Sequence, residues 1–204
     1  MADKGECRVA RKKLNYPFFV IIGPSGSGKT KVAEAVFPAA YKVISNTTRQ
    51  MRKEEQDGVD YYFKTNEQFQ ELVRTNALAE HDTYHGNQYG VGIDELLQKT
   101  SDHYAYDVLT IKGFQDIEKR FGNMVIPIFL EVSKKNVLKR LQSREDEDEI
   151  IKERSALYDQ EYQNKDKVIT YQNSYLIDAN QSYEEVVKDV KQAVDEVLKI
   201  NRWL

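Results

Sequence analysis

GPSGSGKT, residues 23–30, follows directly on an apolar run of aromatic and β-branched residues, Phe18–Ile22. A short run of this kind that ends at a glycine is typical of a buried parallel strand leading into a loop. The octapeptide meets the pattern GxxxxGK[ST], in which glycines let successive backbone N–H groups point at phosphate oxygens. We therefore expect a phosphate-binding loop between a strand at 18–22 and a helix at 29–37.

Lys29 and Thr30 give this loop its predicted chemistry. A lysine at this position places a mobile cation at the β- and γ-phosphates of a nucleoside triphosphate. The hydroxyl group that follows it completes the coordination shell of a magnesium ion. Thr30 is therefore the expected metal ligand and Mg²⁺ the expected metal.

Further apolar runs recur along the chain, and most are separated by segments with helical periodicity. The runs lie at 41–44, 106–111, 124–130 and 174–177. The helical segments lie at 66–76, 93–99, 114–121, 134–144, about 147–162 and 182–198. Strands that alternate with helices in this way predict an α/β fold, in which a parallel sheet is flanked by helices on both faces.

Residues 45–92 differ from the rest of the chain. They are rich in Asn, Thr, Arg, Gly and Tyr, and they contain the short strand-like pieces DYYF at 60–63 and ALAEH at 77–81. We interpret this stretch as a small lobe inserted into a single sheet domain of residues 17–204. Residues 1–16, which are rich in charged side chains, are expected to form a flexible tail.

Composition narrows the class of protein. With 30 basic and 33 acidic side chains the formal net charge is −3, so nucleic acid is not an expected partner. No apolar run approaches the roughly 20 residues of a membrane span, so no membrane partner is expected. Cys7 is the only cysteine, which excludes an intramolecular disulfide and favours a reduced, cytoplasmic setting.

A second group of residues is suited to binding a phosphate group. The segment SNTTRQMRKEEQDGVDYYF, residues 45–63, places Arg49 and Arg52 three residues apart, with Tyr61 beyond a turn. Guanidinium groups bind phosphate oxygens in pairs and stay charged. Beside a complete nucleotide loop, this segment predicts a second anion site, where the phosphate of an acceptor molecule would bind.

Together these motifs resemble the guanylate kinase family, enzymes that transfer the γ-phosphate of ATP to GMP. The resemblance covers about residues 17–198 and includes AEHDTYHGNQYG at 79–90, LKRLQSR at 138–144 and KERS at 152–155. It implies ATP as phosphate donor, Mg²⁺ as metal and small-molecule nucleotides as substrates. It also implies an acceptor-binding lobe at about 45–92 and a lid at about 142–155, both closing over the substrates.

The resemblance further implies which residues form the site. The donor nucleotide would be bound by Gly23, Ser25, Gly26, Ser27, Gly28, Lys29, Thr30, Arg140 and Arg144. The acceptor would be bound by Ser45, Arg49, Arg52, Tyr61, Glu80 and Tyr89. The catalytic residues would be Lys29, Arg49, Arg52, Arg144 and Arg154. These cations would position and neutralise phosphate groups, which is most of what phosphoryl transfer requires.

The guanine-recognition positions depart from the family pattern. Ser45 and Glu80 are in place, but Val91 replaces a hydroxyl residue, and Thr110 and Lys112 fall where carboxylates are expected. A carboxylate accepts hydrogen bonds from guanine N1–H and the 2-amino group, whereas a lysine only donates. An alignment shifted by a residue would instead turn Lys112 toward solvent. GMP or dGMP is the default acceptor, and the base preference stays open.

Two other functions also stay open. The stretch YGVGIDEL, residues 89–96, resembles the ribose 1,5-bisphosphate phosphokinase branch of the same superfamily, so that compound or a different nucleotide is an alternative acceptor. A catalytically silent guanylate-kinase-like interaction module is the other alternative. The complete loop motif favours an enzyme, because such modules typically have degraded nucleotide loops. A monomer or a homodimer is expected.

Overall fold

The computed structural model describes residues 13–84, 86–142 and 148–200 of the 204-residue chain. Within these ranges the strands form two four-stranded sheets. The larger sheet has the strand order β6-β1-β7-β8 and is parallel throughout. Its strands are β1 (Phe18–Ile22), β6 (Ala105–Val108), β7 (Val125–Glu131) and β8 (Tyr175–Asp178). The predicted α/β fold with a parallel sheet is confirmed.

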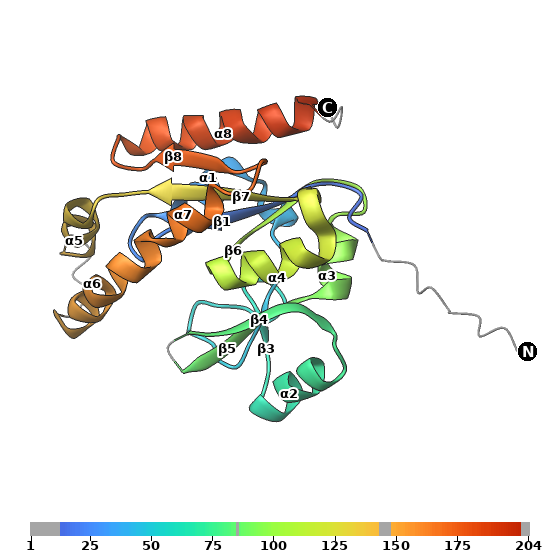
Figure 1. The fold of residues 1–204 in the computed structure, drawn as a ribbon. Coiled ribbons are helices and arrows are strands. Elements are labelled where there is room, and N and C mark those ends of the chain that lie inside the picture. The colour runs from blue at the N-terminus through green and yellow to red at the C-terminus, as the bar shows by residue number, and fades with distance from the viewer. Residues whose placement is uncertain (1–12, 85, 143–147, 201–204) are drawn as a thin grey trace, which may run out of the picture.

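Helices cover both faces of the larger sheet, and Figure 1 shows α8 above it and α4 below it. One face packs against α1 (Lys29–Val36) and α8 (Tyr183–Ile200). The opposite face packs against α3 (Ile93–Lys99), α4 (Ile111–Phe121) and α7 (Asn164–Val168). The sheet is therefore the middle layer of three, as the sequence predicts.

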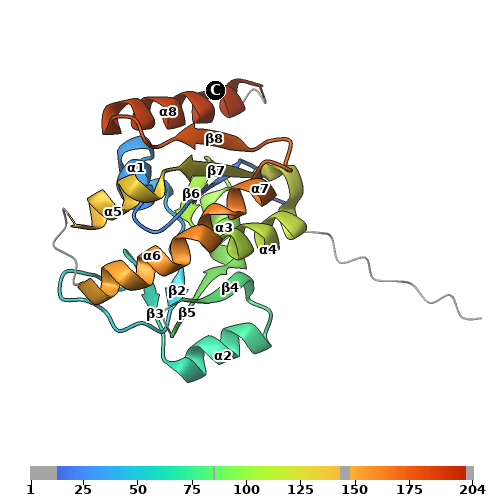
Figure 2. The same ribbon diagram turned by 60° about the vertical axis from the view of Figure 1, so that its left-hand side comes forward.

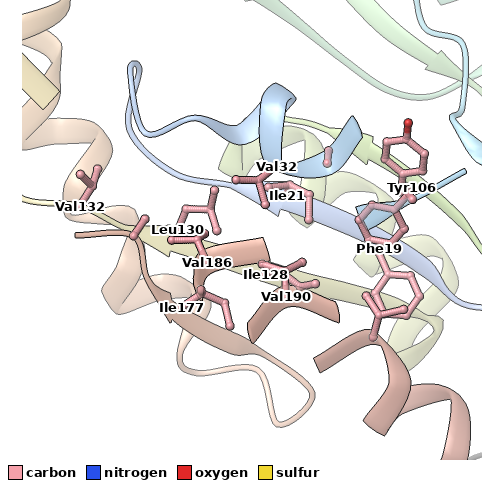
Figure 3. Packing of buried hydrophobic residues seen from close by; sticks show 14 of the residues in the cluster. Phe19, Ile21, Val32, Tyr106, Ile128, Leu130, Val132, Ile177, Val186 and Val190 are labelled. Atoms are coloured by element: carbon pink, nitrogen blue, oxygen red, sulfur yellow. The ribbon is translucent and has the colours of Figure 1, made fainter. Parts of the chain in front are cut away.

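The central strand β1 is apolar at every position because both of its faces are covered. Phe19 and Ile21 join the hydrophobic cluster that includes Val190 of α8, and Figure 3 shows these side chains gathered between the strands and the helix. Val20 faces the other way and joins the cluster that includes Phe114 of α4. Side chains alternate across a strand, so a strand buried on both faces reads as a continuous apolar run.

The smaller sheet belongs to the segment 46–92, called the small lobe below. Its strand order is β3-β2-β5-β4, and Figure 2 shows it beneath the larger sheet with α2 at its far end. The elements are β2 (Asn46–Thr47), β3 (Tyr62–Phe63), α2 (Asn66–Arg74), β4 (Leu78–Tyr84) and β5 (Asn87–Gly92). Helix α2 begins at a capping box, in which Thr65 and Gln68 bind each other's backbone N–H groups.

The remaining elements follow the carboxyl end of β7 or connect strands. They are α5 (Lys134–Gln142), α6 (Asp148–Tyr162) and the short 3₁₀ turns Ala39–Tyr41 and Gly122–Met124. Among the described residues, no helix is long and apolar enough to cross a membrane.

Three predicted boundaries are wrong for local reasons. The run 41–44 is not a strand, since Lys42 makes a single bridge to Tyr106 after a 3₁₀ turn. The run 106–111 stops being a strand at Val108, because Thr110 caps a helix that begins at Ile111 rather than 114. The piece 77–81 extends to Tyr84 as one arm of a β-hairpin with β5. Hydrogen bonds of the helix cap and hairpin decide these ends, and apolar periodicity does not report them.

Some predictions fall outside the described residues. These are the tail with Cys7 up to residue 12, and positions 143–147 with Arg144 in the middle of the expected lid.

Truncation of a fully buried side chain of the larger sheet should destabilise the protein. Phe129 of β7 is fully buried, so Phe129→Ala should lower the free energy of unfolding by about 3–5 kcal/mol. Ile169→Ala is the matched control, because this side chain is 52% exposed and its loss should cost within about 0.5 kcal/mol. Urea denaturation followed by circular dichroism measures both, and a Phe129→Ala cost below about 1 kcal/mol would contradict the packing.

Candidate functional site

The glycine-rich loop joins β1 to α1 in a conformation that excludes larger residues. Gly23 has φ +154°, and a Cβ added there would lie 2.8 Å from the carbonyl oxygen of Leu130. Gly28 has φ +94° and precedes the first residue of α1. Both positions need glycine, the first for close approach to β7 and the second for its left-handed backbone. The loop residues Ser25 and Gly26 lie between them.

A buried hydroxyl group in the loop lacks a partner. Ser27 Oγ accepts and donates no hydrogen bond to any described residue, although its residue is only 2% exposed. Buried polar groups are nearly always satisfied, and an exception calls for an explanation. A ligand that presents oxygen atoms to the loop would satisfy this hydroxyl, so the loop fits a phosphate chain.

Lys29 lies folded back over the loop. Its Nζ donates to the carbonyl oxygens of Gly23 at 2.8 Å and Pro24 at 3.0 Å. Burial lowers the pKa of Lys29 to about 8, while the carboxylate of Glu161 opposes the shift and Arg154 adds to it. The ammonium group is thus close to its titration range and would gain a strong partner from a phosphate oxygen.

Helix α6 brings a carboxylate to the loop. Glu161 Oε2 accepts a hydrogen bond of 2.7 Å from the backbone N–H of Ser25. Arg154 lies on the same helix and is close enough to Lys29 to affect its pKa. Arg140 of α5 donates to the carbonyl oxygens of Ser27 and Ala179, at 3.0 and 2.6 Å. The predicted residues Arg140 and Arg154 therefore come to the loop, whereas Arg144 lies outside the described residues.

Thr30 stands in the first turn of α1, and its side chain is exposed. Across the described parts of the chain, no group of three His, Cys, Asp or Glu side chains is placed to bind a metal ion. A metal at this site would therefore depend on the Thr30 hydroxyl and on ligand oxygens rather than on a cluster of carboxylates.

Four of the six predicted acceptor residues, Arg49, Arg52, Tyr61 and Tyr89, lie together on the small lobe. The guanidinium of Arg49 lies over the ring of Tyr61 at 5.4 Å, and the rings of Tyr61 and Tyr89 are 5.9 Å apart. Arg49 makes a two-pronged ion pair with Glu55, with N–O distances of 2.9 and 2.7 Å. Glu55 also accepts from the backbone N–H of Arg52, whose side chain is exposed. The structure thus brings Arg49, Tyr61 and Tyr89 together, and Glu55 links Arg49 to the backbone of Arg52.

Two ionisable groups here have shifted pKa values. The hydrogen bond from Arg49 lowers the pKa of Glu55 to about 2, although this carboxylate lies near the surface. Burial raises the pKa of Tyr61 to about 12, with a smaller contribution from the charge of Asp107. Tyr61 therefore keeps its proton at neutral pH and remains a hydrogen-bond donor.

The seam between the small lobe and the larger sheet contains two buried carboxyl groups, Glu80 and Asp107, which are 5% and 6% exposed. Glu80 Oε1 accepts a hydrogen bond from Val91 N–H at 3.0 Å. Asp107 accepts from Ser45 Oγ at 2.8 Å and from Val108 N–H at 2.7 Å. Among the described residues, neither carboxyl group has a salt bridge.

Burial is the main cause of raised pKa values at both carboxyl groups. The pKa of Glu80 rises to about 8, and the charge of nearby Asp107 adds to the shift. The pKa of Asp107 rises to about 6, because the hydrogen bonds from Ser45 and Val108 offset only part of the desolvation. Glu80 also lies over α4, where a Cβ on Gly113 would be 2.8 Å from its Oε2.

The first turn of α4 gives Thr110 and Lys112 other contacts than the ones expected. Thr110 Oγ1 accepts from Gly113 N–H at 3.1 Å and donates to Asp82 at 2.9 Å. The side chain of Lys112 is 53% exposed and donates to the carbonyl oxygen of His81 and to Asp116. Lys112 thus lies at the surface, as the shifted alignment allows, and Val91 is fully buried.

Comparison with known proteins identifies the family. A family model described as "Guanylate kinase" matches residues 16–197. This chain belongs to the guanylate kinase family. It is 40% identical over 139 residues to a guanylate kinase of Chlorobium luteolum, a match that covers 64% of this chain and 68% of that protein. A guanylate kinase of Chlorobaculum tepidum is 36% identical over 134 residues, covering 63% and 68%.

A solved structure has the same fold. The crystal structure of guanylate kinase from Anaplasma phagocytophilum superposes with a TM-score of 0.61 at 23% identity, covering 90% of this chain and 87% of that one. Membership of the guanylate kinase family makes the chain a nucleoside monophosphate kinase.

Sequence reasoning missed three carboxylates of this guanylate kinase family member. Asp107 was visible as a lone acid inside the apolar run 106–111. Glu55 and Glu161 carried no signal, because acidic residues are common in polar loops and on helix surfaces. Their partners, Arg49 and Ser25, are identified by the fold alone.

Glu80→Gln should stabilise the protein, and more so at higher pH. Below about pH 4.5 the carboxyl is neutral in both states; between pH 4.5 and 8 the unfolded chain ionises while the folded chain holds its proton. Wild type should therefore lose stability relative to Glu80→Gln over this interval, by up to about 1.4 kcal/mol per pH unit. Urea denaturation at pH 5 and pH 8 measures the difference. Glu184→Gln, at an exposed position of α8, is the control, and an equal gap at both pH values would refute the shift.

Proposed function

We propose that the chain transfers the γ-phosphate of ATP to GMP or dGMP and forms the nucleoside diphosphate. The observation that carries the choice of guanine is Glu80, a buried carboxyl group whose Oε2 accepts no hydrogen bond from a described residue. A carboxylate there matches the two adjacent donors of guanine, N1–H and the 2-amino group. Buried donors or acceptors left unpaired cost about 1–3 kcal/mol each, so this match contributes to selection of the base.

The donor nucleotide would be bound by the loop at 23–30. Its backbone N–H groups and the Ser27 hydroxyl would bind phosphate oxygens, and Lys29 would exchange its two carbonyl partners for the β- and γ-phosphates. Arg144 and Arg154 would lie in a lid at about 142–155, and Arg140 of α5 would stand just before it. Magnesium, when bound, neutralises phosphate charge, and Thr30 would hold it.

The acceptor phosphate would bind on the small lobe, proposed to be the acceptor-binding lobe at about 45–92. Arg49, now paired with Glu55, would transfer its two-pronged hydrogen bonds to phosphate oxygens, and Arg52 would add a second cation. Tyr61 would donate a hydrogen bond to a phosphate oxygen, because its hydroxyl group stays protonated at neutral pH. The acceptor oxygen is already anionic, so positioning and charge neutralisation suffice and no general base is needed.

Lys29→Ala should reduce kcat for ADP formation by at least about a hundredfold, because it removes the cation proposed to act on the transferred phosphate. Lys31→Ala is the matched control, since Lys31 is exposed one position beyond Thr30 and lies over the ring of Tyr183. The measurement is a coupled ADP-release assay with ATP and magnesium. Equal activity of the two variants would contradict the assignment of Lys29.

The same assay distinguishes the alternative functions. The acceptor panel is GMP, dGMP, AMP, CMP, UMP, dTMP and ribose 1,5-bisphosphate, with turnover expected for GMP and dGMP. If another acceptor is phosphorylated and GMP and dGMP are not, that acceptor is the substrate and the assignment of guanine is wrong. Absence of ADP release with every acceptor, together with binding of a protein partner that Lys29→Ala retains, would identify an interaction module.

GMP binding should depend on the ionisation of Glu80. The free protein holds this proton up to about pH 8, whereas guanine needs the carboxylate, so binding at neutral pH releases a proton. The KM for GMP should fall by up to tenfold per unit from pH 7 to pH 8 and level off above it. Glu80→Gln should have a higher KM without this slope. A wild-type profile that parallels Glu80→Gln would assign the slope to other groups, such as the substrate phosphate.

A further inference from the structure

Asp107 controls the direction of a buried hydrogen bond. Its Oδ1 accepts from the N–H of the next residue, Val108, at 2.7 Å, and its Oδ2 accepts from the Ser45 hydroxyl at 2.8 Å. An ionised carboxylate only accepts, and a serine hydroxyl has a single proton. The Ser45 proton is therefore committed to Asp107, and Ser45 Oγ offers any other group its lone pairs.

A second hydroxyl on the same seam has its proton committed in the same way. Thr110 Oγ1 donates to Asp82 Oδ2 at 2.9 Å and accepts from Gly113 N–H. The charges of Asp107, Asp82 and Lys112 all affect the pKa of Glu80. This carboxyl group therefore interacts electrostatically with both pairs. Val91, at a position where a hydroxyl was expected from the sequence, contributes no polar side chain at all.

The hydroxyl groups of Ser45 and Thr110, and the carboxyl group of Glu80 once it is ionised, therefore present hydrogen-bond acceptors. The charge of Lys112 lowers the pKa of Glu80, but its ammonium group already donates to the His81 carbonyl oxygen and to Asp116 at the surface. Around Asp107, the charges that contribute are Lys42 and Glu95, and both act through space rather than by a hydrogen bond to it. A molecule that satisfies the seam must bring N–H or amino donors.

We propose that Asp107 is a specificity-determining residue: by holding the Ser45 hydroxyl as an acceptor, it makes the acceptor pocket select nucleobases by their amino and ring N–H donors. This inference rests on the proposed function and adds to it a residue outside the sequence motifs. For guanine it predicts dependence on the 2-amino group, which inosine monophosphate (IMP) lacks.

Asp107→Asn keeps the shape of the side chain but reverses the direction of its hydrogen bond with Ser45. Val108 N–H requires an oxygen at its partner position, so the asparagine carbonyl must face Val108 and its amino group must face Ser45. The amino group then donates to Ser45 Oγ, and the Ser45 proton turns toward the pocket. The acceptor that met the ligand becomes a donor.

The experiment compares kcat/KM for GMP and IMP in wild type, Asp107→Asn, Ser45→Ala and the double variant at pH 8, where Asp107 is ionised. Wild type should prefer GMP by about tenfold or more. Asp107→Asn should reduce this preference by about five- to tenfold through KM, with kcat within about twofold. Ser45→Ala should also reduce it, and the double variant should match Ser45→Ala, since Asp107 acts through Ser45.

The outcomes separate the inference from the function on which it rests. An unchanged GMP-to-IMP ratio in Asp107→Asn, or equal losses for both nucleotides, would make Asp107 a structural residue and overturn the inference while GMP kinase activity stands. A further loss of the preference in the double variant would overturn the route through Ser45. Wild type that neither binds GMP in calorimetry nor phosphorylates it would overturn both. If Asp107→Asn does not fold, an unchanged ratio in Ser45→Ala still refutes the inference.

Discussion

The rest of the site depends on the position of β1 in the middle of a parallel sheet. Helices cover both faces of the strand, so the residues that follow it are exposed to ligands at the carboxyl edge of the sheet. There Gly23 packs against the Leu130 carbonyl oxygen. β6 lies directly beside β1 and ends at the same edge, one position after Asp107. Loops that follow adjacent parallel strands meet, which is where ligands bind in sheets of this type. The glycine loop and the Asp107 seam are neighbours for that reason.

Charge is distributed differently in the two halves of the site. On the phosphate side, Arg49 has Glu55, Arg140 has backbone carbonyls, and Lys29 has carbonyls with Glu161 nearby. On the side proposed to bind the base, the carboxyl groups of Glu80 and Asp107 have no described salt-bridge partner, and their pKa values are raised. In the proposed function, the phosphate groups of two nucleotides would bind the first half, and the N–H donors of the acceptor base would bind the second. Each half therefore has the charge that the group proposed for it requires.

The first turn of α4 joins these halves physically. Thr110 binds Asp82, Lys112 binds the His81 carbonyl, and Gly113 leaves room for Glu80. All three contacts link the larger sheet's helix to β4 of the small lobe. These contacts fix the position of Glu80 relative to α4 and so hold the small lobe against the larger sheet.

Elements with a local sequence pattern were predictable from the chain alone. The apolar run Phe18–Ile22, the loop glycines and the helix at 93–99 all lie where periodicity and spacing predict them, because a strand buried on two faces, a left-handed turn and an amphipathic helix each constrain consecutive residues. The tertiary structure alone decided which charges meet. Ser25 is hydrogen-bonded to Glu161, 136 residues away in the sequence, and Ser45 to Asp107, 62 residues away. Lys112 lies at the surface. Such contacts depend on how elements pack, and burial of the carboxyl groups, which sets their pKa values, follows from that packing and not from neighbours in the chain.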